Sequence, residues 1–294
     1  MAWSEAASAP SGRSDSAIGI ALWAAVAVYA VARVTQAFPE RLPTPLIVAS
    51  HVLPALGFML LHGTLVYRVR GVLVFLLCCL LIGNFTENLS IATGFPFGHY
   101  HFTAAMGPKL LQVPILLGLA YVGMGYVSWT LGRIMIGGYR EPLLGSRVWM
   151  VPLVAAFVMV AWDLSMDPIW SNLVHAWEWH DGGPYFGVPV SNFLGWYFTV
   201  YLIYQSFALY LRGQASSAAG TSNGVWLSAV AFYGVSAAGN LLVIPPPGLS
   251  TVVDRSGTKW QVSAILGVSA LVSLFVMGAF AVLAMGRLAD RGRE

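Results

Sequence analysis

The sequence predicts an all-α integral membrane protein, a polytopic bundle of about eight transmembrane helices, with seven as the alternative count. Hydrophobic residues make up 57% of the 294 residues and charged residues only 9%, whereas soluble domains contain about 25% charged residues. Such a chain lacks the polar surface that covers a globule in water. Its apolar residues also fall in runs of about 20, the length that a helix needs to cross a bilayer.

Eight apolar stretches qualify, or nearly qualify, as spanning helices. They cover residues 17–36, 44–66, 71–93, 109–132, 148–166, 191–211, 224–244 and 261–286. The seventh carries Asn240 and ends in a proline run that cannot continue a helix. We expect one transmembrane domain over residues 17–286, a disordered cytoplasmic tail over residues 1–16 and a short cytoplasmic tail over residues 287–294.

The basic residues predict how the helices are oriented. With eight spans, the side of the termini carries ten of them, Arg13, Arg68, Arg70, Arg133, Arg140, Arg147, Arg212, Arg287, Arg291 and Arg293. The other side carries five, Arg33, Arg41, Lys109, Arg255 and Lys259. Because basic residues concentrate in cytoplasmic loops, we expect both termini in the cytoplasm of a prokaryotic cell. Scattered basic residues and a net charge of +3 give no reason to expect a nucleic-acid partner.

Several chemistries are disfavoured by composition. Cys78 and Cys79 are adjacent in an apolar run, so neither a disulfide framework nor a thiolate metal site is expected. The chain has no pair of Asp-rich motifs for a magnesium-bound diphosphate, which argues against a prenyltransferase. Lys109 and Lys259 fall at helix ends, which argues against a buried retinal Schiff base.

A metal site is an alternative that the histidines raise. His99 and His101, with Glu87, Glu178 or His180, offer imidazole and carboxylate ligands that suit iron or zinc. Six histidines are nevertheless few for a membrane oxidase built on histidine clusters. We therefore expect no metal and no cofactor.

The first polar stretch is "GNFTENLSIATGFPFGHYHF", residues 83–102. Glu87 interrupts an apolar helix, where a carboxylate costs several kcal/mol unless it is paired, protonated or facing water. It is a candidate catalytic acid; the alternative is a neutral structural acid that bonds to a neighbouring helix. The following glycines and proline predict an ordered loop or re-entrant turn that carries Phe97, His99 and Tyr100, unless these rings form an ordinary interfacial belt.

The second stretch is "AWDLSMDPIW", residues 161–170. Asp163 and Asp167 are four residues apart and share a helix face, with Trp162 beside them. Two carboxylates this close repel, so one of them is expected to keep its proton near neutral pH. The alternative is that Asp167, which precedes Pro168, only ends the helix.

The third stretch, residues 175–196, alternates aromatic rings with polar groups. Its candidates are Trp177, Glu178, Trp179, His180, Asp181, Tyr185, Asn192 and Trp196. Residues 181–189 predict turns, and Ser191 then suits the N-cap of the next helix. An interfacial anchor would explain the tryptophans but not the acids and histidine among them.

These stretches together resemble the membrane carotenoid-biosynthesis hydratase family. The motifs are "ENLSIATGFPFGHYHF", then Lys109 and "VP" at residues 113–114, then "DLSMDPIW", "WEW" and "GGPYFGVPVSNFLGWY". The family is represented by gamma-carotene 1',2'-hydratases and the bisanhydrobacterioruberin hydratases of haloarchaea. The resemblance covers residues 80–200, whereas the flanking helices match only in being apolar.

The resemblance implies addition of water across the terminal carbon-carbon double bond of a linear carotenoid, without a redox cofactor. Such a site must supply a proton, hold a tertiary cation and admit water. For the proton we expect Glu87, Asp163 or Asp167, in that order. For the cation we expect the rings of Trp162, Trp177, Trp179, Tyr185 and Trp196. His99, His180 or Asp181 would orient water, and further substrate contacts would come from Phe97, Tyr100, Glu178 and Asn192.

The expected partners are a carotenoid or other long isoprenoid, the lipid bilayer and other enzymes of the same pathway. A carotenoid or terpenoid cyclase is the nearest alternative, because it uses the same protonation and excludes water. A non-catalytic carotenoid or lipid binder is the alternative from another class. A transporter would be expected to show an internal repeat or paired broken helices, which the sequence does not display.

Overall fold

The computed structural model describes residues 12–37, 41–214, 218, 220–243 and 248–290, and it confirms the all-α class with membrane-like helices. Six helices precede one long C-terminal rod. The six are α1 (Gly12–Thr35), α2 (Thr44–Thr93), α3 (Ile115–Ile136), α4 (Arg147–Asn172), α5 (Val190–Arg212) and α6 (Asn223–Asn240). The rod runs through α7 (Val262–Leu271), the π-helical segment η3 (Val272–Met277) and α8 (Gly278–Asp290).

The long element α2 is two helices joined by a reversal. Arg68 breaks it, with φ 58° and ψ 172°. A Cβ atom built on Gly63 would lie 3.0 Å from Cγ2 of Val72, although nine residues of continuous helix would separate the two by about 13 Å. The two halves therefore fold back on each other, which matches the separate helices expected over residues 44–66 and 71–93.

Within the described part of the chain, five helical segments are long and apolar enough to cross a membrane. They are Ala17–Thr35, Pro45–Thr93, Ile115–Ile136, Arg147–Asn172 and Val262–Asp290. The second of them contains both halves of α2. The stretches expected at residues 191–211 and 224–244 also form helices, α5 and α6, but neither belongs to this apolar group.

Some predicted boundaries are wrong. The fourth helix begins at Ile115 rather than at residue 109, because β2 (Lys109–Leu110) and β3 (Val113–Pro114) pair as a small hairpin there. α1 begins at Gly12 and α8 ends at Asp290, so parts of both expected tails are helical. Residues 1–11, the proline run at 245–247 and residues 291–294 lie outside the described residues.

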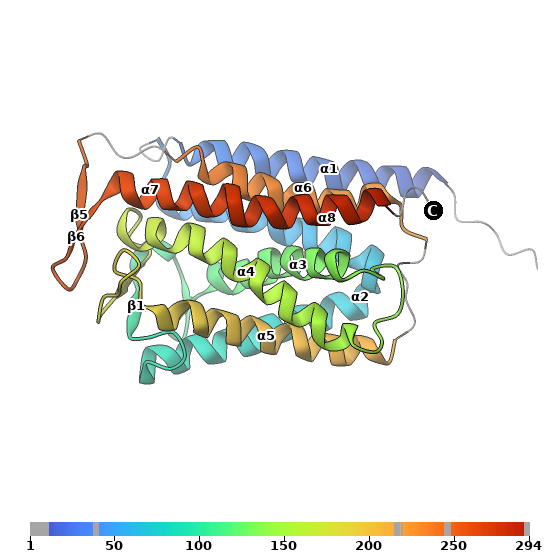
Figure 1. Ribbon diagram of the computed structural model, residues 1–294, viewed down its shortest axis with the longest axis horizontal. Coiled ribbons are helices and arrows are strands. Elements are labelled where there is room, and N and C mark those ends of the chain that lie inside the picture. Colours follow the sequence, from blue (N-terminus) through green and yellow to red (C-terminus); the bar gives the residue numbers. More distant parts are fainter. Residues whose placement is uncertain (1–11, 38–40, 215–217, 219, 244–247, 291–294) are drawn as a thin grey trace, which may run out of the picture.

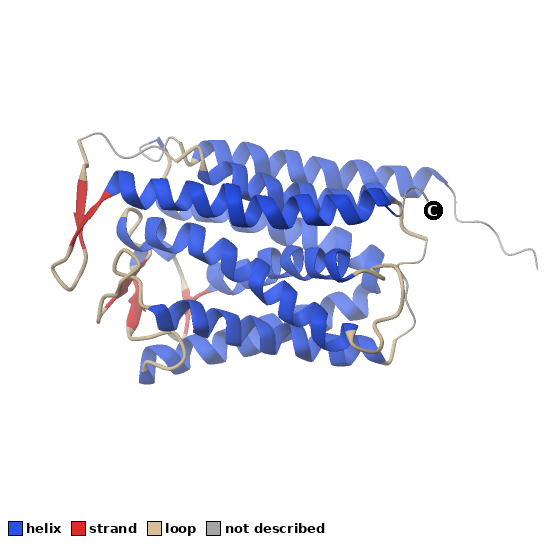
Figure 2. Ribbon diagram, in the orientation of Figure 1, coloured by secondary structure: helices blue, strands red, loops and turns tan. Residues whose placement is uncertain are grey.

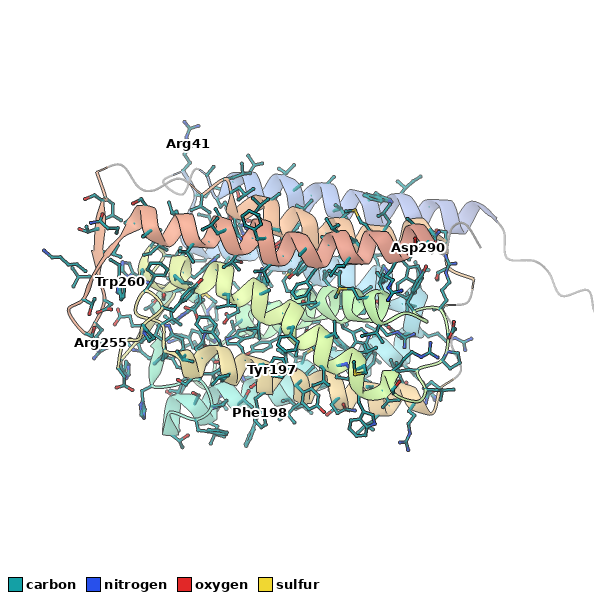
Figure 3. All side chains as sticks on the ribbon, in the orientation of Figure 1. Arg41, Tyr197, Phe198, Arg255, Trp260 and Asp290 are labelled. Atoms are coloured by element: carbon teal, nitrogen blue, oxygen red, sulfur yellow. The ribbon has the colours of Figure 1, made fainter. Side chains whose placement is uncertain are left out.

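The helices run side by side, and the start of α1 and the end of α8 lie at the same end of the bundle (Figure 1). The strands gather at the opposite end (Figure 2). There β1 (Tyr100–Phe102) pairs with β4 (Trp177–Trp179), and β5 (Thr251–Val253) pairs with β6 (Lys259–Gln261). Arg41 and Arg255 lie at this strand end and Asp290 lies at the other (Figure 3). The placement of Arg41 and Arg255 at one end and of Asp290 at the other agrees with a chain that crosses the bundle an even number of times.

The β1–β4 ribbon has two faces of different character. Tyr100 pairs with Trp179, His101 with Glu178, and Phe102 with Trp177. Since side chains alternate along a strand, one face carries the two pairs of buried rings and the other carries the half-exposed His101 and Glu178. We call this ribbon the roof, because its aromatic face covers the strand end of the bundle.

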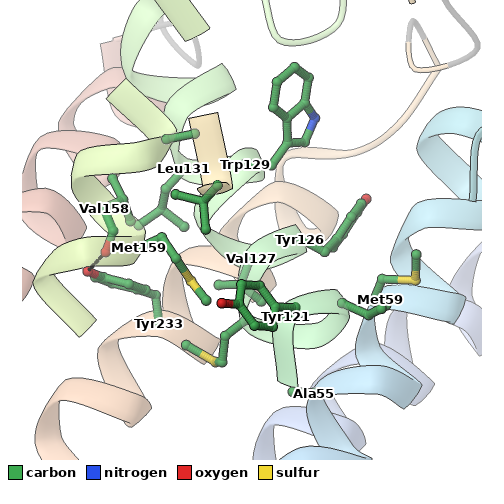
Figure 4. Packing of buried hydrophobic residues seen from close by; sticks show 14 of the residues in the cluster. Ala55, Met59, Tyr121, Tyr126, Val127, Trp129, Leu131, Val158, Met159 and Tyr233 are labelled. Carbon is green, nitrogen blue, oxygen red and sulfur yellow. Dashed lines mark hydrogen bonds between the residues drawn. The ribbon is translucent and has the colours of Figure 1, made fainter. Parts of the chain in front are cut away.

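Helix α3 forms the centre of the bundle. Its side chains Tyr121, Tyr126, Val127, Trp129 and Leu131 are at most 2% exposed, and they pack against residues from three other helices (Figure 4). Those neighbours are Ala55 and Met59 of α2, Val158 and Met159 of α4, and Tyr233 of α6. Small residues let α2 and α3 approach closely, as membrane helices often do.

We predict that Gly123→Ala destabilises the bundle. A Cβ at Gly123 would lie 2.6 Å from Cβ and 2.9 Å from the backbone carbonyl carbon of Ala55, so α2 and α3 must separate. Overpacking of this kind costs about 1–3 kcal/mol. The check is thermal unfolding of the purified protein in detergent. Gly234→Ala in α6 is the control, since a Cβ there meets nothing within 4 Å, and equal melting temperatures for the two variants would contradict the prediction.

Candidate active site

Three buried carboxyl groups surround a small cavity beneath the roof. Glu87 comes from the second half of α2, and Asp163 and Asp167 come from α4. They are 3%, 1% and 1% exposed. The cavity encloses about 20 Å³, which is room for about one water molecule. It is lined by Glu87, Phe97, Tyr100, Phe102, Leu117, Asp163, Asp167, Trp177, Trp179, Asn192 and Trp196.

Both oxygens of Glu87 accept hydrogen bonds from phenols. The Tyr100 hydroxyl donates to Oε2, and the Tyr121 hydroxyl donates to Oε1 at 2.6 Å. Burial, followed by the charge of Glu87, raises the pKa of Tyr100 in the roof well above its ordinary value, so this phenol stays protonated and remains a donor. Tyr121 belongs to α3, so its bond joins Glu87 to a neighbouring helix. A bond of this kind was expected if Glu87 is a structural acid.

Asp167 is fully hydrogen-bonded. The indole Nε1 atoms of Trp177 and Trp179 donate to its Oδ1 at 3.0 and 3.4 Å, and Asn192 Nδ2 donates to its Oδ2 at 2.8 Å. Three donors of this kind satisfy the acceptor oxygens of this buried carboxyl group. The helix continues past Pro168 to Asn172, so the alternative in which Asp167 only ends the helix is wrong.

Asp163 differs from the other two acids. Its Oδ2 accepts from Asn192 Nδ2 at 3.1 Å, so one amide bridges both aspartates. Its Oδ1 is buried and has no hydrogen-bond partner among the described residues. A buried carboxyl oxygen without a partner is costly, and this one belongs to a side chain that lines the cavity.

Aromatic rings make up most of the remaining wall. The Trp196 ring stacks on Tyr121, with centroids 4.5 Å apart and planes 5° apart. The ring centroid of Tyr100 lies 4.8 Å from that of Trp179 and 5.3 Å from that of Phe102. Such rings present negatively polarised faces that attract a cation. The cavity therefore combines carboxyl groups with cation-attracting surfaces, and none of the described residues that line it is Lys or Arg.

Tight packing between α5 and the 94–99 loop fixes the cavity wall. A Cβ on Gly195 would lie 2.7 Å from the Pro96 carbonyl oxygen, so only glycine allows this approach. The Ser191 hydroxyl donates to the Phe97 carbonyl at 2.9 Å. The expectation that Ser191 caps the helix is therefore wrong, because Pro189 occupies the N-cap and Ser191 joins α5 to the loop.

The polar residues in and beside the roof do not line the acid cavity. His99 Nδ1 lies 2.8 Å from Asp181, and His101 Nδ1 lies 2.9 Å from His180 Nε2. Partial burial, then the charges of Arg255 and His101, lower the pKa of His180. None of His99, Glu178, His180 and Asp181 lines the cavity, which argues against their expected contact with water or substrate. No group of three metal-ligating side chains occurs among the described residues.

Two other expected site residues lie just outside the cavity. The Tyr185 hydroxyl donates to the Leu164 carbonyl at 2.9 Å. Burial, with the charges of Asp163 and Asp167, raises the pKa of Tyr185 to about 12. Trp162 packs edge-on to Trp196, with centroids 6.5 Å apart, and lines a second cavity.

The second cavity is apolar and adjoins the first. It encloses about 60 Å³ between α1, α2, α3 and α4, and it shares Leu117 and Trp177 with the acid cavity. Its walls include Val48, Val52, Ala120 and Met124, with Arg33 and His51 as polar members. The acids are thus bordered by an apolar space.

Sequence reasoning missed three residues of the site. Tyr121 bonds to Glu87, while Phe102 and Leu117 line the acid cavity. Tyr121 lies in a mostly apolar helix, and such a tyrosine signals a buried hydrogen bond. Its partner could not be identified without the packing of α2 against α3.

We predict that Asn192→Leu lowers the free energy of unfolding by about 1–3 kcal/mol. The change keeps a similar volume but removes the amide that serves both aspartates. The check is denaturant or thermal unfolding in detergent. Ser191→Ala, which removes a half-buried bond on the same turn, should cost clearly less, and an Asn192→Leu protein as stable as the Ser191→Ala protein would contradict the prediction.

Comparison with known proteins assigns the chain to a family. The model of the family described as carotenoid biosynthesis protein matches residues 47–253, more than two thirds of the chain. Comparison with curated proteins returned no match, and comparison with solved structures returned none either. The matched range contains every residue that lines the acid cavity. The chain therefore belongs to the carotenoid biosynthesis protein family, as the resemblance of its motifs predicted.

Proposed function

We propose that the protein is a carotenoid hydratase, which adds water to the terminal double bond of a linear carotenoid end group. The observation that carries the proposal is the unpartnered Oδ1 of Asp163, a residue that lines a cavity with room for about one water between carboxyl groups and aromatic rings. Family membership supplies the substrate class, an isoprenoid of carotenoid biosynthesis. The steps below assign a role to each group.

Asp163 is the proton donor of this proposal. The oxygens of Glu87 and Asp167 are occupied by phenol, indole and amide donors, whereas Oδ1 of Asp163 has none. A carboxylic acid needs no donor on the oxygen that carries its proton. This geometry favours Asp163 over Glu87, the first choice from sequence.

Protonation of the alkene produces a tertiary cation. The proton moves from Asp163 Oδ1 to the less substituted, chain-side carbon of the double bond, and the positive charge develops on the terminal carbon that carries the two methyl groups. The carboxyl groups of Asp167 and Glu87 and the faces of Trp196 and Trp179 stabilise this charge. Preorganised groups in a site that excludes bulk water stabilise charge more strongly than water does.

Water then completes the reaction. Its oxygen bonds to the cationic carbon, and one of its protons passes to the Asp163 carboxylate, which restores the acid. One water is consumed, no proton is gained or lost overall, and no electron leaves the substrate. The balance requires no redox cofactor.

The apolar cavity beside the acids provides a place for the polyene chain. Because it shares Leu117 and Trp177 with the acid cavity, a chain held there would extend its end group toward Asp163. The site lies at the strand end of the bundle, remote from the chain ends (Figure 1). With the termini in the cytoplasm, as the basic residues predict, this end would face the outer side of the membrane.

Product analysis tests the function. The protein would be produced in bacteria that accumulate lycopene or gamma-carotene, and the pigments compared with those of cells carrying an empty vector. A hydratase gives a more polar pigment that is heavier by one water. A cyclase gives an isomer of unchanged mass, and unchanged pigments in both hosts would favour a non-catalytic binder.

We predict that Asp163→Asn, Asp167→Asn and Glu87→Gln each lower hydration by at least about 100-fold, the usual contribution of acid–base catalysis. Amides cannot donate a carboxyl proton or carry negative charge, yet they keep the volume of the site. The check is product formation per amount of folded, membrane-inserted protein. Glu178→Gln on the outer face of the roof should keep near-normal turnover, and full activity of Asp163→Asn would remove Asp163 as the donor.

We predict that Trp196→Leu slows hydration by roughly 30-fold. A desolvated cation–π contact is worth about 2 kcal/mol, and leucine keeps an apolar wall without the polarised face. The measurement is the initial rate with saturating carotenoid in detergent. Trp149→Leu on the exposed surface of α4 is the matched control, and equal rates for the two variants would exclude Trp196 from cation stabilisation.

A further inference from the structure

A large cleft opens at the end of the bundle that carries the chain termini, remote from the acid cavity. It encloses about 440 Å³ between the reversal of α2, the end of α3 and the end of α5. Three arginines line it, Arg68, Arg70 and Arg133, together with Tyr67, Tyr210 and Gln214. Among the described residues of its wall, Glu141 is the one carboxylate.

Arg133 places a buried cation in this wall. It is 3% exposed, and its Nη2 group donates to the carbonyls of Gly138, Tyr139 and Glu141. Its Nε is buried and has no partner among the described residues. The Glu141 carboxylate attracts this charge, but its ion pair within 4 Å is with Arg147, at 2.7 Å. A buried guanidinium with an unpartnered nitrogen is costly and attracts an anion.

Arg68 and Arg70 supply accessible charge at the mouth of the cleft. Both are exposed, and within the described part of the chain neither is paired with a carboxylate. Arg68 holds φ at 58° and ψ at 172°, a conformation that costs a non-glycine residue of order 1–3 kcal/mol. Glycine would relieve this cost, so an arginine here is consistent with a role for its guanidinium.

The position of the cleft indicates the kind of anion. Helices that span a bilayer end at the level of the lipid headgroups, and this cleft lies where α2 reverses and α3 and α5 end. Guanidinium groups bind phosphate oxygens through paired hydrogen bonds. Basic pockets between membrane helices bind phospholipid headgroups by these means.

We propose that the cleft binds the phosphate group of an anionic membrane phospholipid. Arg68 and Arg70 contact the phosphate oxygens at the mouth, and Arg133 supplies the fixed charge within. The acyl chains lie against the exposed apolar surface of the helices beside the cleft, where Val69 is 60% exposed. The site is independent of the carotenoid chemistry at the other end of the bundle.

The test compares three probes on the purified full chain in detergent. The probes are phosphatidylglycerol, phosphatidylcholine and soluble glycerol phosphate. Bound lipid is counted by native mass spectrometry, and affinity is taken from the rise in melting temperature with probe concentration. The variant is Arg68→Gln with Arg70→Gln, and the control is Arg212→Gln with Arg287→Gln, which removes two charges from the same end outside the cleft.

The expected result is retention of phosphatidylglycerol at about tenfold higher affinity than phosphatidylcholine, lost in the cleft variant and kept in the control variant. Equal binding of the two lipids, or undiminished binding in the cleft variant, would overturn the site. If glycerol phosphate binds as tightly as phosphatidylglycerol, a free phosphate ester rather than a lipid is the occupant, and the lipid assignment fails. An unchanged melting temperature of the cleft variant without probe confirms that it folds.

Discussion

The structure depends on keeping three carboxyl groups buried at the end of an apolar bundle. Each such group costs several kcal/mol in a membrane unless donors satisfy it. The donors come from segments far apart in the sequence, with Tyr121 from α3, Trp177 and Trp179 from the roof, and Asn192 from α5. The hydrogen bonds that offset the free-energy cost of burying the acids therefore also join the helices to one another.

One carboxyl oxygen without a hydrogen-bond partner distinguishes this cluster from a purely structural one. If every carboxyl oxygen had a hydrogen-bond partner, structural hydrogen bonds between helices would be enough to explain the cluster. Asp163 Oδ1 has none among the described residues, and Asp163 lines a cavity of about 20 Å³ between aromatic rings. The adjoining apolar cavity leads an isoprenoid chain toward that oxygen in the proposed mechanism, so binding and chemistry use neighbouring spaces.

The sequence predicted the helices well because apolar runs of membrane length follow from the bilayer itself. It also singled out Glu87, Asp163 and Asp167, since acids in such runs are rare. The sequence could not show which loop residues face the acid cavity and which face away from it. Glu178 lies on the outer face of a ribbon whose alternation became clear only from the β1–β4 register, and His99, His180 and Asp181 flank that ribbon. Tyr121 and the reversal at Arg68 depend on contacts between helices.

The most direct measurement is hydration in doubly labelled water. Purified protein and its carotenoid substrate would be incubated in D₂O enriched in oxygen-18, and the product examined by mass spectrometry and NMR. Our account predicts one deuterium on the carbon next to the new alcohol carbon and one oxygen-18 in the hydroxyl group. A product with deuterium but no labelled oxygen, or with neither label, would contradict the addition of water to a protonated alkene.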